Sequence, residues 1–221
     1  FVLGGGANIL VADAGIRGIV LDITTLNEMS HHGALLRCGA GADVTAVTGY
    51  AADAGLGGID FLHSMPGTIG GAVWMNARCY GSSIVEILRE VRGVTTEGAR
   101  FVYRPREDEW AYKKSPFQGR GDVITSCDFH LYREAPEEIW NRMLGYYRDR
   151  EQKGHFAAPS AGSVFKNNRE FGKPSGAIID SLGLRGTRVG GARVSDEHAN
   201  IIVNTGTATA WDIRNLMELV R

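Results

Sequence analysis

Thirty glycines among 221 residues constrain what this chain can fold into more than any other feature. This is roughly twice the average share of about 7%. The glycines separate short apolar and β-branched runs, as in "FVLGGGANILVAD" and "GIDFLHSMPGTIGGAVW". Glycine permits tight turns and close approach of two backbones. The pattern therefore predicts short elements joined by tight turns, and not a flexible linker.

The spacing of apolar residues predicts both strands and helices. Expected strands lie in 1–5, 8–13, 18–23, 34–42, 82–105, 122–133 and 188–204, with glycine turns in the longer stretches. Expected helices lie in 43–55, 135–153, 175–183 and 208–221, the last capped by Thr207 or Thr209. In the helix of 135–153, Ile139, Met143, Leu144 and Tyr147 should share one apolar side. The mixed order indicates an α+β protein of at least two units, with a boundary between Gly154 and Pro159.

Composition and charge exclude several function classes. The net charge of −1 gives no electrostatic footprint for nucleic acid or a membrane surface. No apolar run is long enough to span a bilayer. Three scattered cysteines form neither a disulfide framework nor a zinc pattern, so we expect no metal site and a reducing compartment. Phe1 already lies in an apparent strand, and we expect an earlier strand to precede it.

The first glycine loop does not fit the common nucleotide-binding motifs. A dinucleotide G-x-G-x-x-G fingerprint would use Gly4 and Gly6, but Ile9 occupies the third glycine position and no helix follows. A P-loop would need a Gly-Lys-Ser/Thr sequence, which is absent. Two interpretations stay open: an anion-binding nest of backbone N–H groups, and a plain glycine hairpin.

A second glycine-rich stretch runs from Met65 to Gly81. Its Pro-Gly and Gly-Gly pairs would again let the backbone approach a partner. Two separated glycine loops could hold two parts of one large cofactor, such as the pyrophosphate and ring system of FAD. The alternative is a buried turn in which the glycines serve packing.

A third stretch, "PSAGSVFKNN", contains Ser163 and Lys166. It lacks the glycine of a nucleophile elbow, because Phe165 stands two positions after the serine. One hypothesis is a hydrolase triad of Ser163, His198 and either Asp196 or Asp180. The other makes Ser163 a proton donor to a strongly basic acceptor such as a carbanion.

These stretches, with "GGARVSDEHANIIVN", resemble in order the blocks of the UDP-N-acetylenolpyruvoylglucosamine reductase family. The resemblance implies an α+β fold: an FAD-binding domain of the vanillyl-alcohol-oxidase type with two α/β lobes, followed by a smaller α+β substrate-binding domain. The implied ranges are 1–25 for part of the first lobe, 26–154 for the second lobe and 155–221 for an incomplete substrate domain.

The resemblance also implies an activity. NADPH would reduce FAD, which would pass hydride to the enolpyruvyl ether of a UDP-sugar and give UDP-N-acetylmuramate for peptidoglycan synthesis. It implies a cytoplasmic monomer whose partners are small molecules. Two alternatives stay open: another FAD oxidoreductase with a different substrate, and a non-catalytic nucleotide-binding fragment.

The resemblance assigns the candidate site residues to three groups. Ser163 would be the proton donor, and Lys113 takes the place of the family's arginine in a Tyr-Arg-x-Ser block. Lysine keeps the charge but loses the planar fork of arginine. A family glutamate that assists protonation is expected in a segment beyond Arg221. The implied FAD contacts are Gly4, Gly5, Gly6, Ala7, Asn8, Pro66, Gly67, Thr68, Gly70, Gly71, Asn76 and Gly81, and the implied substrate contacts are Tyr112, Lys166, Asn167 and His198.

Overall fold

The computed structural model describes residues 1–221, and the chain divides into two compact units. The first unit contains Phe1–Gly6 and Val20–Tyr147, and the second contains Ala7–Ile19 and Arg148–Arg221. The finer division into two lobes and a substrate domain stays a proposal.

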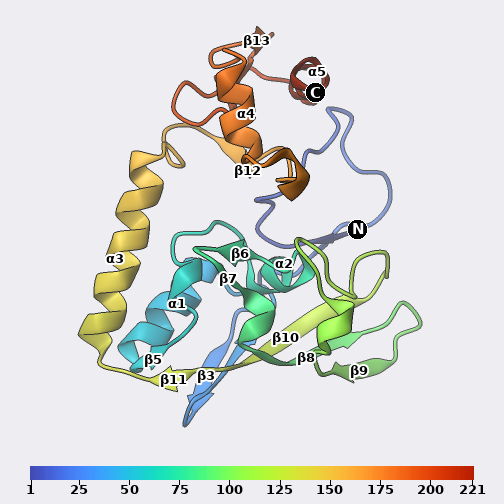
Figure 1. Cartoon of the computed structure of the whole chain (residues 1–221). Coiled ribbons are helices and arrows are strands. Elements are labelled where there is room, and N and C mark those ends of the chain that lie inside the picture. Colours follow the sequence, from blue (N-terminus) through green and yellow to red (C-terminus); the bar gives the residue numbers. More distant parts are fainter. The chain divides into compact units, whose positions relative to one another are not determined.

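A five-stranded antiparallel sheet forms the centre of the first unit (Figure 1). Its order is β3 (Met29–His32), β4 (Leu35–Gly39), β10 (Val123–His130), β8 (Leu88–Val94) and β9 (Arg100–Tyr103). Side chains alternate between the two faces of a strand. Leu36 and Cys38 of β4 and Cys127 and Phe129 of β10 are accordingly buried on one face.

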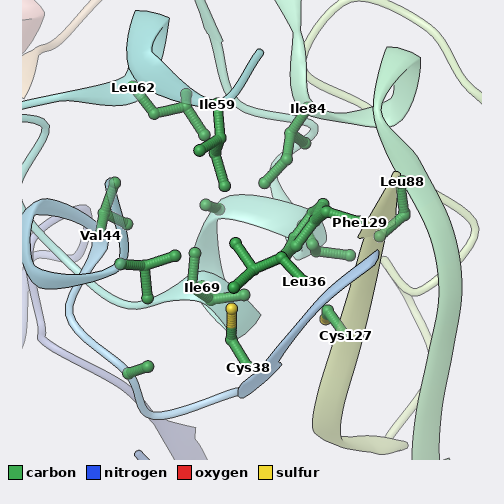
Figure 2. Packing of buried hydrophobic residues seen from close by; sticks show 14 of the residues in the cluster. Leu36, Cys38, Val44, Ile59, Leu62, Ile69, Ile84, Leu88, Cys127 and Phe129 are labelled. Atoms are coloured by element: carbon green, nitrogen blue, oxygen red, sulfur yellow. The ribbon is translucent and has the colours of Figure 1, made fainter. Parts of the chain in front are cut away.

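Two helices belong to the core on that face. They are α1 (Val44–Asp53) and the short α2 (Ile69–Trp74). Figure 2 shows Leu36 and its register partner Phe129 side by side, with Val44 and Ile69 from the helices around them. Helix α1 begins at Asp43, whose carboxylate accepts the Ala46 N–H, as expected for a cap.

Charged side chains occupy the other face of the sheet. Asp128 of β10, whose side chain is only 4% exposed, accepts hydrogen bonds from Arg37 and Arg92 on the two flanking strands. Burial alone would raise the pKa of Asp128, but the hydrogen bonds from the two arginines outweigh it and lower the pKa. The carboxylate therefore stays charged and ties three strands together.

The remaining elements of the first unit are short. Strands β1 (Val2–Leu3) and β2 (Leu21–Asp22) are parallel, β11 (Tyr132–Arg133) pairs with β5 (Leu56–Gly57), and β6 (Arg78–Cys79) pairs with β7 (Ser82–Ser83). Single 3-10 turns lie at Asp60–Leu62, Ile84–Glu86 and Glu107–Glu109.

Some of the predicted elements are wrong. Residues 8–13 were expected to form a strand, but this segment has no regular structure, and Gly15 and Gly18 with positive φ follow it. In α3 (Pro136–Gln152), Ile139 and Met143 are buried as expected, whereas Leu144 and Tyr147 are exposed. The apolar stripe of α3 is therefore narrower than its sequence indicates.

The second unit has its own antiparallel sheet, in the order β12 (Ser160–Ser163), β15 (Ile201–Asn204), β14 (Ala192–Val194) and β13 (Arg188–Val189). Helix α5 (Ala210–Val220) buries Leu216 against Ala192, Val194 and Ile202 of this sheet. Helix α4 (Ser175–Ser181) and a 3-10 turn at Arg169–Phe171 complete the unit. No helix of the chain combines the length and the apolar character needed to cross a bilayer.

Candidate active site

The two glycine loops of the first unit lie against each other. A Cβ atom added to Gly4 would come within 2.3 Å of Thr68 Oγ1, and one added to Gly5 would come within 3.0 Å of the Gly67 Cα. Neither position has room for a side chain. The glycines at the end of β1 thus allow a close approach that the sequence could suggest but not locate.

Thr68 leaves a polar atom without a partner beside this contact. It is 6% exposed, caps α2 in extended backbone geometry, and makes no side-chain cap hydrogen bond. Its Oγ1 is buried and unpaired. Because a buried hydroxyl without a partner costs about 1–3 kcal/mol, the atom is suited to a bound group.

The backbone of the first loop supplies donors next to it. None of the N–H groups of Gly4, Gly5 and Gly6 donates a hydrogen bond to another backbone group. Gly6 has φ of +66°, a conformation that favours glycine. Successive free N–H groups in such a turn form a concave site for an anion. The loop and Thr68 therefore fit a phosphate group, which agrees with the anion-nest interpretation.

The glycines of the second loop differ in how much room surrounds them. Gly70 serves packing, because a Cβ there would lie 2.9 Å from the Ala40 Cβ. The N–H groups of Ile69 and Gly70 are already donated to the carbonyls of Ala42 and Ala40. Gly71 has room, with the Thr68 Oγ1 at 3.6 Å from an added Cβ. The FAD contacts expected of Pro66, Gly67, Gly70, Gly71 and Gly81 stay predictions.

A cavity of about 460 Å³ in the first unit brings three expected site residues together: Asn76, Tyr112 and Lys113. Arg78 and Glu86 also line it. Asn76 is 4% exposed and its Oδ1 is buried without a partner. The cavity thus combines an amide acceptor with groups of both charges.

Asn76 and two residues of the "WAYKKSPFQ" segment fix the loop that carries Lys113. Asn76 Nδ2 donates to the Ala111 carbonyl at 2.9 Å, and Ser115 Oγ donates to the Trp74 carbonyl at 2.7 Å. Gln118 Nε2 donates to the carbonyls of Trp74 and Lys113 at 3.0 and 3.1 Å. Asn76 and Lys113 both have positive φ, which glycine would adopt at lower cost. Gln118 was not among the expected site residues, because no local signal in the sequence marks it.

A second cavity, of about 360 Å³, lies in the second unit and brings Ser163, Asn167 and His198 together. Asp180, Arg185 and Glu197 also line it. Asn167 accepts the Ser175 N–H at 2.9 Å through Oδ1, so its Nδ2 is the group left for a ligand. Lys166 does not line this cavity, and its carbonyl accepts the Ser175 hydroxyl.

The side-chain partners around Ser163 contradict a hydrolase triad. A triad histidine donates its Nδ1–H to a carboxylate, whereas His198 Nδ1 accepts the Asn200 N–H at 3.2 Å. Asp180 is bound by Arg185, and Asp196 lies 3.0 Å from the guanidinium of Arg193. Neither carboxylate is left to orient the imidazole.

His198 and its neighbour His155 are both neutral at pH 7. Burial, the largest effect, lowers the pKa of His198, and the nearby Arg185 lowers it further. The ring of His155 lies 5.2 Å from that of His198, between centroids, and burial with this neighbour lowers the pKa of His155 to about 4. Neutral His198 with Nδ1 as acceptor carries its proton on Nε2.

Two models of protein families match parts of this chain. The sequence model of an FAD binding domain matches residues 1–102, and that of the UDP-N-acetylenolpyruvoylglucosamine reductase C-terminal domain matches residues 154–221. The UDP-N-acetylenolpyruvoylglucosamine reductase of Treponema denticola is 40% identical over the whole chain and 73% of its own length. That of Borreliella burgdorferi is 39% identical over the whole chain and 74% of its length.

A solved structure supports the same assignment. The crystal structure of UDP-N-acetylenolpyruvylglucosamine reductase from Thermus caldophilus has a TM-score of 0.88 with this chain at 36% identity. It matches all of this chain and 80% of its own. The predicted α+β fold, with an FAD-binding domain followed by a smaller domain, is confirmed. The chain belongs to the UDP-N-acetylenolpyruvoylglucosamine reductase family.

Proposed function

We propose that this chain reduces the enolpyruvyl ether of UDP-N-acetylglucosamine to UDP-N-acetylmuramate, with FAD as cofactor and NADPH as reductant, in peptidoglycan precursor synthesis. Family membership over the whole chain carries this proposal. The bound flavin supplies hydride transfer, which neither cavity of the protein can supply by itself. What the protein's own residues contribute is binding, charge stabilisation and a proton.

The first unit holds the cofactor in this proposal. The free N–H groups of Gly4, Gly5 and Gly6 and the unpaired hydroxyl of Thr68 bind the pyrophosphate. A Cβ added to Gly6 would meet nothing within 4 Å, so open space lies beside this part of the loop. The same donors would suit any pyrophosphate, so the identity of the nucleotide rests on the match to the FAD binding domain.

Lys113 and Ser163 have complementary tasks. Hydride addition to the β-carbon leaves negative charge at the α-carbon and its carboxylate, and Lys113 stabilises that charge. The Ser163 hydroxyl then delivers the proton to the α-carbon. Tyr112 beside Lys113, and Asn167 and His198 beside Ser163, contact the substrate. Lys166 lies outside the lining of both cavities, whereas Asn167 lines the second one.

Separate measurement of the two half-reactions tests these roles. Ser163→Ala should leave reduction of the flavin by NADPH intact and slow its reoxidation by the enolpyruvyl substrate by about 10²–10⁴-fold. Lys113→Ala should slow the same second half-reaction, and Lys113→Arg should retain most of it. Equal losses in both half-reactions would contradict the proton-donor role. A flavin that NADPH reduces but that the substrate does not reoxidise in the wild-type protein would favour an oxidoreductase with another substrate.

A cytoplasmic location and a monomeric state complete the proposal. The nucleotide-sugar substrate and NADPH support the location, because both are metabolites of the cell interior. Light scattering on the purified flavoprotein measures the second point, and a mass of twice the chain would contradict it.

A further inference from the structure

Asn200 lines the second cavity and makes four hydrogen bonds to nearby residues. Its N–H donates to His198 Nδ1 at 3.2 Å, and its carbonyl accepts the Val164 N–H at 2.8 Å. Its side-chain Oδ1 accepts the Phe165 N–H at 2.8 Å, and its Nδ2 donates to the Phe165 carbonyl at 2.9 Å. All polar groups of Asn200 thus have partners, and the residue is 5% exposed.

These contacts connect two groups that the proposed reaction needs. Val164 and Phe165 directly follow Ser163, so the two hydrogen bonds that Asn200 accepts from them and the one that it donates to Phe165 fix the backbone on which Ser163 is carried. The fourth fixes the ring of His198 and its tautomer, with the proton on Nε2. No other amino acid has both a donor and an acceptor at the positions of the asparagine amide, because aspartate lacks the donor and leucine lacks both.

We propose that Asn200 is a positioning residue, which holds the Ser163 hydroxyl and the Nε2–H of His198 in fixed relation across the substrate cavity. The role of Ser163 in this inference rests on the proposed function, whereas the effect on His198 does not. Helix α4 contributes to the same arrangement. A Cβ added to its Gly176 would lie 3.4 Å from the Asn200 Cβ and 3.5 Å from His198 Cε1, so the helix packs directly over both residues.

Kinetics of the flavin-loaded enzyme provide the first test. Asn200→Ala removes both amide hydrogen bonds and should slow reoxidation by the enolpyruvyl substrate by about 10–100-fold, the effect of a displaced catalytic group. Reduction by NADPH should be unchanged. Asn200→Asp keeps the acceptor for the Phe165 N–H but turns an oxygen toward the Phe165 carbonyl, and its rate should lie between those of the wild type and Asn200→Ala.

A matched control separates positioning from stability. Asn204 lies on the same strand, β15, and its Oδ1 accepts two backbone N–H groups, those of Gly206 and Ala208. It does not line the cavity. Asn204→Ala should therefore lower the urea midpoint much as Asn200→Ala does, while both half-reactions proceed at the wild-type rate. An equal slowing in the two variants would overturn the proposal.

The second test does not depend on turnover. Nitrogen NMR of the ¹⁵N-histidine-labelled protein reports which ring nitrogen of His198 carries the proton. The donor to His198 Nδ1 is the backbone N–H of Asn200, which both substitutions retain; what they lose or disturb are the amide bonds to Phe165 that hold this backbone in place. We therefore expect a single Nε2–H tautomer in the wild type and in Asn204→Ala, and a mixture in Asn200→Ala and Asn200→Asp as the N–H moves away from Nδ1. A wild type that shows this tautomer but does not reduce the substrate would refute the proposed function and leave the positioning of His198 standing. An unchanged His198 signal in both Asn200 variants would refute the positioning of His198 by the Asn200 side chain, and Asn200→Asp alone gives this answer if Asn200→Ala proves too unstable to assay.

Discussion

Replacing Gly4 with alanine should destabilise the first unit through one contact, with Thr68. The added Cβ would lie 2.3 Å from Thr68 Oγ1, about 1 Å closer than an ordinary contact between non-bonded heavy atoms. Gly4 is not among the glycines with positive φ, so alanine meets no backbone strain there. The cost is therefore that of overpacking, about 1–3 kcal/mol.

The cost should disappear when the Thr68 side chain is shortened. In Thr68→Ala the nearest remaining atom is the Cβ, at 3.5 Å, which is an ordinary contact. In that background Gly4→Ala should be neutral, or stabilising by about 0.4–1 kcal/mol through the entropy of the unfolded chain. Thr68→Val keeps the branch, so Gly4→Ala should stay costly in it. In a double-mutant cycle of Gly4→Ala and Thr68→Ala, the expected coupling energy is therefore about 1–3 kcal/mol.

Urea unfolding of the flavin-free protein, followed by circular dichroism, measures each corner of the cycle. With a slope of about 2 kcal/mol per molar urea, a loss of 2 kcal/mol shifts the midpoint by about 1 M. Gly6→Ala is the control, because Gly6 has φ of +66° and open space around its Cα. Its cost of about 1–2 kcal/mol is backbone strain and should be the same in every Thr68 background. A Gly4→Ala cost that does not respond to Thr68→Ala would refute the steric argument.

Three further outcomes follow from contacts within single units. The pKa of Asp128 is lowered in the folded state, so its contribution to stability is present above the unfolded pKa of about 4 and is lost as pH falls through the folded value. Urea midpoints measured from pH 6 to pH 3 should therefore fall less steeply in Asp128→Asn than in the wild type. Parallel curves would contradict this. The pKa of His155 is also lowered, to about 4, so the stability that it contributes is complete above pH 6.5 and declines toward pH 4. His155→Gln should make the urea midpoint less dependent on pH between 6.5 and 4. An unchanged dependence would show that the ring is not buried as described. Thr209 forms a capping box with Asp212 at the start of α5, so Thr209→Ala should lower the free energy of unfolding by about 1 kcal/mol, whereas Thr207→Ala should have little effect; calorimetry of the two variants decides between them.

Helices and the chemistry of the loops could be predicted from the sequence because their signals are local. The spacing of Val44, Val47 and Ala51 located α1, and Gly55, with φ of +64°, ends it as expected. The choice between Thr207 and Thr209 was open, and the hydrogen bond of Asp212 N–H to Thr209 Oγ1 decides it.

Other features depend on partners far away in the sequence. Residues 69–74 form a helix although they contain two adjacent glycines. Glycine is needed at position 70 because its backbone passes close to Ala40. No local propensity reports that contact. Asn200 was overlooked for the same reason, since its side chain is satisfied by Phe165, 35 residues earlier. The resemblance to one family located Ser163 and His198, but the hydrogen-bonding residue between them came only from the structure.

The two arginines on Asp128 have a consequence for how the first unit comes apart. Arg37, Asp128 and Arg92 lie on three neighbouring strands, and β10, which carries the aspartate, is the middle one. Pulling either flanking strand away would strip one cation from a carboxylate that still has the other. Separation of β4 or β8 should therefore break one of the two ion pairs, whereas removal of β10 should break both at once. Under mechanical load or local fraying, the sheet should lose its outer strands first and keep the strand with Asp128 until last.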